Sequence, residues 1–187
     1  MSATIASTGG PIYFFREHEH PYGFLSQWFD APFTAASSSS PDPDPDATPL
    51  TFRTAEQYMM YRKARLFGDA EIAAQIMLAI TPKEHKALGR KVKNFDGTVW
   101  DANREGIVEE GNWSKFCSSK NGARWRDMLL ETGDRDLVEA SPFDRIWGIG
   151  YSAENAEANR SKWGANLLGK ALVRVRERIK AQNTVAG

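Results

Sequence analysis

The chain has 187 residues, of which 41% are hydrophobic and 26% charged, ordinary values for a globular domain. Basic and acidic residues both number 24, and the formal net charge of zero argues against nucleic-acid binding through bulk positive charge. The single cysteine excludes an internal disulfide and any metal site that needs two thiolates. No apolar run could span a membrane and no signal peptide is visible, so we expect an intracellular protein, in the cytoplasm or nucleus.

Low-complexity segments mark the expected domain organisation. Residues 1–10 are small and polar and are expected to be disordered, and residues 181–187 are expected to form a flexible C-terminus. Residues 35–49 read AASSSSPDPDPDATP, which offers no large apolar side chain to bury. We interpret this segment as an insertion in a single domain that spans residues 11–180. A linker between two domains is the alternative, but the 34 residues before it are too few to fold alone.

The remaining pattern is a string of helices with a few short strands. Residues 11–15 predict an aromatic strand, and residues 33–34 and 50–52 predict two short strands that pair across the insertion. Thr54 and Gln57 form a capping-box pattern that starts a helix running to Phe67. Further helices are expected from Asp69 to Ile80, from Thr81, and over 100–116, 123–131 and 164–180, with a strand at 137–140. The sequence therefore predicts an α+β fold that is predominantly helical.

The usual signatures of hydrolytic and nucleotide-binding sites are missing, since there is no Walker loop, GxGxxG or GxSxG. His18 and His20 could begin a metal site, but no second cluster completes it, so we predict no metal and no cofactor. His85 is expected on the surface of a helix. Cys117 lacks a histidine partner in the sequence and is expected to be a small buried residue.

One face of the helix that starts at Thr54 carries a carboxylate and an ammonium group. Glu56, Met60, Lys63 and Phe67 follow the i, i+4, i+7, i+11 spacing of a single helix face. Such a face suits a site that holds a charged ligand. The alternative is that Glu56 only complements the helix dipole in the first turn, which is favourable by about 0.3–1 kcal/mol.

A second candidate site lies in the segment LVEASPFDRIWGIG at 137–150. Asp144 precedes Trp147 by three residues, and the glycines that follow permit a close approach of the backbone to a ligand. The alternative is an Asx turn over a packed tryptophan. Trp100 also has two interpretations: it is either a core residue or a platform on which a base stacks.

Residues 113–126 (WSKFCSSKNGARWR) are basic and aromatic. This stretch holds four basic residues and no acidic ones. Such a mixture can grip phosphates and stack on a base, and a solvated basic face is the alternative. At most, the pattern predicts a local anion site.

Together these pieces resemble the NADAR family, also called YbiA-like. The resemblance extends from Ile12 to Ile179 and includes LSQWF followed by APF at 25–33, TAEQY at 54–58, and LETG at 130–133. Its strongest part is LVEAS at 137–141 followed by Asp144 and WGIG at 147–150. It implies a single compact YbiA-like domain.

Members of this family are N-glycosidases that break a bond between ribose C1 and a nitrogen. The resemblance implies that Glu56 and Asp144 are catalytic, Glu56 as the base or the stabiliser of the sugar cation and Asp144 as a group that orients ribose hydroxyls or water. It further implies a set of substrate-binding residues, namely Trp100, Lys63, Arg90, Ser26, Trp147 and Gly148. This chain departs from many members at Gln27, where they have asparagine, and at Gln57, where they have histidine.

Three functions follow as alternatives. The first is removal of ADP-ribose from ADP-ribosylated guanine in DNA or a nucleotide, and the second is hydrolysis of phosphoribosyl intermediates of riboflavin synthesis. The third is a reader that binds ADP-ribose without turnover, which the presence of Glu56 and Asp144 argues against. No riboflavin-pathway domain accompanies the pattern in this sequence, which favours the first function. A single exposed base needs only a local basic patch, so neutral charge is compatible with it. We expect a monomer that does not bind membranes.

Overall fold

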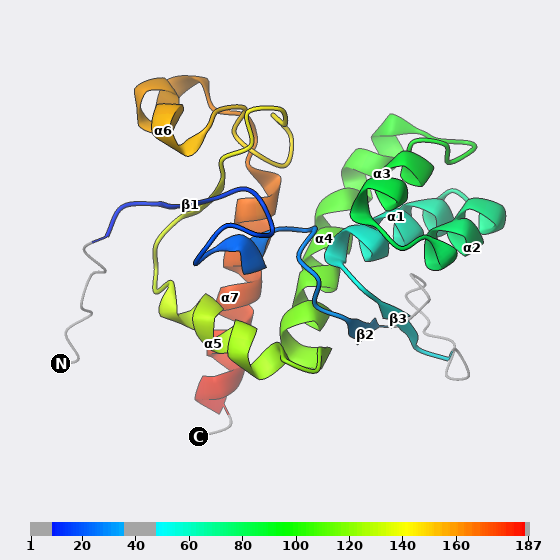
Figure 1. Cartoon of the computed structure of the whole chain (residues 1–187), viewed down its shortest axis with the longest axis horizontal. Coiled ribbons are helices and arrows are strands. Elements are labelled where there is room, and N and C mark those ends of the chain that lie inside the picture. The colour runs from blue at the N-terminus through cyan, green and yellow to red at the C-terminus, as the bar shows by residue number, and fades with distance from the viewer. Residues whose placement is uncertain (1–8, 36–47, 186–187) are drawn as a thin grey trace. The chain divides into compact units, whose positions relative to one another are not determined.

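The computed structural model describes residues 9–35 and 48–185, in which the chain forms two compact units. The central unit lies within residues 27–123, and the terminal unit combines the residues up to Ser26 with those from Arg124 onward. Figure 1 shows the elements of both units along the chain. The predicted predominantly helical α+β fold is confirmed, whereas the single domain over 11–180 stays a prediction.

The central unit is a helical cluster with one two-stranded sheet. Helix α1 packs against three other helices of the unit, and strand β2 packs against α4 (Figure 1). Strands β2 and β3 pair antiparallel with Phe33 opposite Phe52, as the sequence predicted. The elements are β2 (Phe33–Ala35), β3 (Leu50–Phe52), α1 (Ala55–Leu66), α2 (Ala70–Leu78), α3 (Pro82–Gly89) and α4 (Gly97–Ser118).

Local capping explains where these helices begin. The Thr54 hydroxyl accepts a hydrogen bond from the Gln57 amide at 3.1 Å, and α1 starts one residue after Thr54. The Asp69 side chain caps α2 in the same way. At α3, Thr81 and Glu84 form a reciprocal capping box, with proline at the first helical position. These starts were predicted because each depends only on residues within one helical turn.

The terminal unit brings distant segments of the chain together. Strands β1 and β4 pair in parallel, with Ile12 opposite Leu137 and Phe14 opposite Glu139, and α7 packs against β4. The close approach requires Gly169, because a Cβ there would lie 2.0 Å from the Leu137 carbonyl oxygen. The elements are β1 (Ile12–Phe14), the 3-10 helix η1 (Gly23–Leu25), most of α5 (Gly122–Glu131), β4 (Leu137–Glu139), α6 (Ala153–Ala156), the 3-10 helix η2 (Glu157–Lys162) and α7 (Leu167–Val185).

The expectations about four individual residues, Ala35, Ile80, His85 and Cys117, are wrong. Helix α7 extends to Val185, so it includes part of the C-terminus expected to be flexible, and the flexibility itself stays a prediction. Ala35, expected in the insertion, is a buried strand residue, while most of the insertion lies outside the described residues, as do residues 1–8. Ile80 lies beyond the end of α2 and is exposed. His85 is buried although it was expected on a surface, and Cys117 is exposed although it was expected to be buried.

Candidate active site

Glu56 occupies the first turn of α1 and is buried, with only 4% of its surface exposed. Its backbone amide donates to the Gln27 carbonyl oxygen at 3.0 Å, and the Gln27 side chain in turn accepts from Asn112 on α4 at 2.9 Å. A carboxylate that served only the helix dipole would gain about 0.3–1 kcal/mol and could do so in solvent. Burial of a carboxylate costs more than that gain. The position of Glu56 therefore favours a functional carboxylate over a purely dipolar one.

Gln57, where many relatives of the predicted family have histidine, is a structural residue in this chain. Its side-chain oxygen accepts from the Arg53 amide at 2.8 Å, and its side-chain nitrogen donates to the Ile76 carbonyl at 3.0 Å. Both ends of the amide are thus bound to the main chain. The capping pattern is present in modified form, because the Gln57 side chain reaches the residue before Thr54.

Lys63 lies further along the same face of α1 and is anchored to the end of α3. Its ammonium group donates to the Gly89 carbonyl oxygen at 2.9 Å. Met60 packs against the same glycine, since a Cβ at Gly89 would lie 2.0 Å from the Met60 sulfur. Arg90 follows as the C-cap of α3 and is exposed. The Lys63 ammonium group is therefore bound to the main chain next to Arg90, and both residues were predicted to bind the substrate.

Aromatic rings surround the Lys63 ammonium group. It lies 4.3 Å from the centre of the Phe95 ring and 5.5 Å from that of Trp100. Burial lowers the pKa of Lys63 below its usual value. Trp100 is only 9% exposed, which favours the core interpretation of this residue, whereas Phe95 is 49% exposed and has an edge-to-face contact with Phe67. Phe95 is thus the more accessible aromatic surface beside Lys63.

Lys115 on α4 is fully buried, in contrast to the solvated basic face that was one interpretation of residues 113–126. Its ammonium group lies 5.6 Å from the centre of the Phe29 ring and 5.4 Å from that of Phe116. Burial lowers the pKa of Lys115 to about 7. A lysine that titrates near neutrality inside a protein is typical of a functional site, although structural networks also produce such shifts.

In the terminal unit, Asp144 forms the Asx turn that was one of its two interpretations. One carboxylate oxygen, Oδ1, accepts from the amides of Ile146 and Trp147, both at 2.8 Å. Within residues 9–35 and 48–185, the other oxygen, Oδ2, has no hydrogen-bond partner. The side chain is half-buried. The turn fixes the carboxylate and leaves Oδ2 available to a ligand, so the two interpretations are compatible.

The other predicted site residues of this unit are Trp147, Gly148 and Ser26. Trp147 is half-buried and its carbonyl accepts from the Leu168 amide at 3.1 Å. Gly148 is buried, and a Cβ there would lie 2.7 Å from the Glu139 carbonyl oxygen, so close packing requires glycine. Ser26 is buried at the end of η1. In the structure, Trp147 and Gly148 therefore belong to the framework that holds Asp144.

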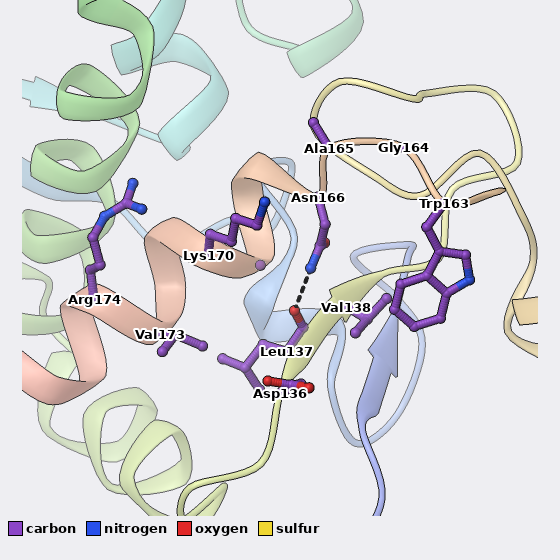
Figure 2. Close-up of a pocket in the computed structure, with 11 residues that line it drawn as sticks. Asp136, Leu137, Val138, Trp163, Gly164, Ala165, Asn166, Lys170, Val173 and Arg174 are labelled. Carbon is purple, nitrogen blue, oxygen red and sulfur yellow. Dashed lines mark hydrogen bonds between the residues drawn. The ribbon is translucent and has the colours of Figure 1, made fainter. Parts of the chain in front are cut away.

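A pocket of about 490 Å³ opens between the start of α7 and strand β4 (Figure 2). The side chain of Asn166 points to the Leu137 carbonyl and donates to it at 2.9 Å, while Trp163 forms the far wall. None of the eight predicted site residues lines this pocket. It is connected to the Asp144 loop through the main chain, because the Asn166 amide donates to the Gly148 carbonyl at 3.2 Å.

Comparisons with known proteins identify the family. The model of the NADAR domain matches residues 13–180. The chain belongs to the NADAR family. It is 42% identical over 155 residues to N-glycosidase R617 of Acanthamoeba polyphaga mimivirus, covering 82% of this chain and 85% of the relative. It is 38% identical over 134 residues to N-glycosidase Npun_R5314 of Nostoc punctiforme, covering 72% and 78%.

The NADAR fold is also found in a solved structure. The NMR structure of the Escherichia coli protein YbiA matches with a TM-score of 0.69 at 23% identity, covering 94% of this chain and 88% of YbiA. In the part of the chain that the structure describes, no three His, Cys, Asp or Glu residues form a group that could hold a metal ion. Among these same residues, no helix combines the length and apolar character needed to cross a membrane.

Reasoning from the sequence missed the burial of Lys115 and the place of Phe95 beside Lys63 in this NADAR domain. Lys115 lies at i+8 from Ile107 and i+4 from Gly111, and all three are buried on one stripe of α4. That spacing was visible in the sequence and could have indicated the burial of Lys115. Phe95 lies in the segment between α3 and α4, and no periodic pattern there indicates that its ring faces Lys63.

Proposed function

We propose that this NADAR protein is an N-glycosidase that hydrolyses a bond between ribose C1 and nitrogen, and that its substrate is ADP-ribosylated guanine. The observation that carries the proposal is the buried carboxylate of Glu56 in the first turn of α1. The names of its relatives from the mimivirus and from Nostoc support the reaction class.

Hydrolysis of such a bond needs few groups. As the bond between C1 and nitrogen breaks, the ribose becomes oxocarbenium-like and the nitrogen takes the bonding electron pair. A carboxylate beside C1 stabilises this positive charge and can accept a proton from the attacking water, whose oxygen bonds to C1. The departing nitrogen gains one proton, so the products are ADP-ribose and the unmodified guanine, which stays attached to its own nucleoside. We assign the carboxylate role to Glu56 and the orientation of ribose hydroxyls or water to Asp144.

The cations and rings of the central unit suit the ADP-ribose part of this substrate. Lys63 is held in place by the Gly89 carbonyl and by two rings, and Arg90 is exposed beside it. We assign the two cations to the pyrophosphate, which prefers such charged hydrogen bonds. Phe95 offers an accessible face for a base, a surface that the buried Trp100 offers to a smaller extent.

The test compares two glutamates at the same helical position. Glu56→Gln removes the charge and basicity with little change of shape, and we expect turnover to fall by about two to four powers of ten while affinity for ADP-ribose persists. Glu71→Gln is the matched control, because Glu71 is also the second residue of its helix but is exposed. It should leave turnover unchanged. Thermal unfolding of both variants shows whether either change acts through stability.

The substrate is tested by offering the purified protein ADP-ribosylated guanosine and, in parallel, a phosphoribosylamino-pyrimidine. Release of ADP-ribose and guanosine in the first assay supports the proposal. Turnover of the second substrate alone would move the protein to riboflavin intermediates, and binding of ADP-ribose without any turnover would make it a reader. Near wild-type turnover by Glu56→Gln would refute the assignment of this residue and transfer the role to Asp144.

A further inference from the structure

Phe143, the residue before Asp144, projects from the terminal unit with 85% of its surface exposed. Burial of a phenylalanine side chain stabilises the folded state by roughly 1.5–3 kcal/mol relative to exposure, and Phe143 does not provide this stabilisation. Ile146, two residues after Asp144, is also about half exposed. Apolar surface gathered around a functional loop is typical of a contact site for a partner or substrate.

The exposure of Phe143 does not come from a loose loop. The main chain that follows it is bound to the segment before α7, with the Ala165 amide donating to the Arg145 carbonyl at 2.8 Å and the Leu167 amide to the Ile146 carbonyl at 3.1 Å. On the other side, the Phe143 amide donates to the Ser141 hydroxyl at 3.4 Å. The ring is therefore presented by a braced backbone, at a fixed position next to the Asp144 turn.

A second ring and two cations accompany Phe143. Phe15 lies with its ring centre 6.4 Å from that of Phe143, and the Arg16 guanidinium carbon lies 5.5 Å from the centre of the Phe15 ring. Arg145 is exposed in the same loop as Phe143, but its guanidinium donates to the Lys162 carbonyl at 2.7 Å and lies 5.8 Å from the centre of the Tyr151 ring. Aromatic faces interleaved with arginines are the means by which proteins bind single-stranded nucleic acid, with rings stacking on bases and cations contacting phosphates.

We propose that Phe143 stacks on the unpaired base next to the modified guanine of a single-stranded nucleic acid, with Arg16 contacting a flanking phosphate. This inference rests on the proposed function, since Phe143 precedes the carboxylate assigned to the reacting ribose. It adds to that function a residue that contacts the strand outside the modified nucleotide. The contact is local, which agrees with a chain of zero net charge.

The experiment uses the full chain and two substrates that carry the same ADP-ribosylated guanine, one a mononucleotide and the other a single-stranded DNA oligomer. We expect Phe143→Ala to lower kcat/KM for the oligomer by about 5- to 150-fold, the effect of one base–aromatic stack, and to leave kcat/KM for the mononucleotide unchanged. Phe143→Trp should retain the preference for the oligomer. Leu78→Ala is the matched control, because Leu78 is 83% exposed on the central unit.

Equal losses on both substrates, or no loss on the oligomer, would overturn the stacking role of Phe143. Failure of the proposed function has a different signature, since the wild-type protein would then release no ADP-ribose from the mononucleotide. In that case, the affinity for a labelled unmodified oligomer, measured by fluorescence anisotropy, decides the inference. Equal affinities of wild type and Phe143→Ala overturn it, and weaker binding by the variant, with the control unchanged, supports it.

Discussion

Two glycines of α4 offer a direct measure of how tightly α1, the helix that carries Glu56, is held. Gly111 is buried against α1, and a Cβ there would lie 2.7 Å from Cδ1 and 3.3 Å from Cε1 of Tyr58. Gly106 lies in the interior of the same helix, and a Cβ there would meet nothing within 4 Å. Alanine at either position adds one methyl group to the same helix. At Gly111 this methyl group collides with Tyr58, and at Gly106 it collides with nothing.

The Tyr58 ring cannot easily make room for the added methyl group. Its hydroxyl bonds to Arg62 and, at 3.1 Å, to Glu110, and its ring meets Phe52 edge-on with centres 5.1 Å apart. Carbon atoms pack best at about 3.5–4.0 Å, so a methyl group at Gly111 requires a displacement of about 1 Å between the two helices. That displacement would be passed to the first turn of α1.

The expected free energies follow from two opposing effects. Glycine to alanine in a helix interior stabilises by about 1 kcal/mol at both positions, because the unfolded chain loses freedom. Overpacking at Gly111 costs about 1–3 kcal/mol in addition. Gly111→Ala should therefore be less stable than Gly106→Ala by that cost, which corresponds to roughly 2–12 °C in melting temperature for a chain of this size.

Thermal unfolding followed by circular dichroism, with both variants beside the wild type, measures this difference. Glycosidase turnover of Gly111→Ala should also fall, because a shift of about 1 Å in a catalytic group can cost about 100-fold. Equal melting temperatures of the two alanine variants would show that the contact between α1 and α4 yields without cost. The inference that this contact positions Glu56 would then be wrong.

Three further predictions concern other parts of the chain. Trp100→Ala should lower the free energy of unfolding by about 3–5 kcal/mol because the ring is buried, while Trp100→Phe should keep most of the activity; denaturant titration and turnover of both variants check this. Replacement of residues 36–47 by a short Gly/Ser loop should leave turnover and melting temperature unchanged, and a large loss of either would show that the segment contributes to fold or substrate binding. Burial lowers the pKa of His85 below its ordinary 6.5, so the unfolded chain binds the proton more readily and stability should fall as the pH drops below about 6.5. Melting temperatures between pH 7.5 and 5 should show a shallower slope for His85→Gln than for wild type, and equal slopes would contradict the prediction.

The helices were predictable from the sequence because their boundaries are set locally. Thr54, Asp69 and Thr81 each bond to an amide within one turn, and such signals can be read without knowledge of the fold. The pairing of β1 with β4 was not predictable, because it joins Ile12 to Leu137 and depends on how the whole terminal unit packs. His85 was misassigned for the same reason, since the neighbours that bury it come from outside its own helix.

The candidate site was predictable to a similar degree. The spacing of Glu56 and Lys63 predicted a shared helix face, which the structure shows packed against the end of α3 through Met60 and Lys63. The two interpretations of Asp144 could not be separated by spacing alone, because an Asx turn and a ligand-binding carboxylate need the same residue types. The exposure of Phe143 depends on the bonds between its loop and the start of α7, which no local pattern reveals.

The stretches of chain that form the two units also determine the order in which the units can fold during synthesis. The central unit is one continuous stretch that ends at Ala123, so all of its internal contacts become available once that stretch has left the ribosome. The terminal unit needs α7, which ends at Val185, and β1 has no partner until β4 has been made. At about 5–20 residues per second, the remaining chain takes roughly 3–12 s to synthesise. The helix that carries Glu56 can therefore be in place before the loop that carries Asp144 can close.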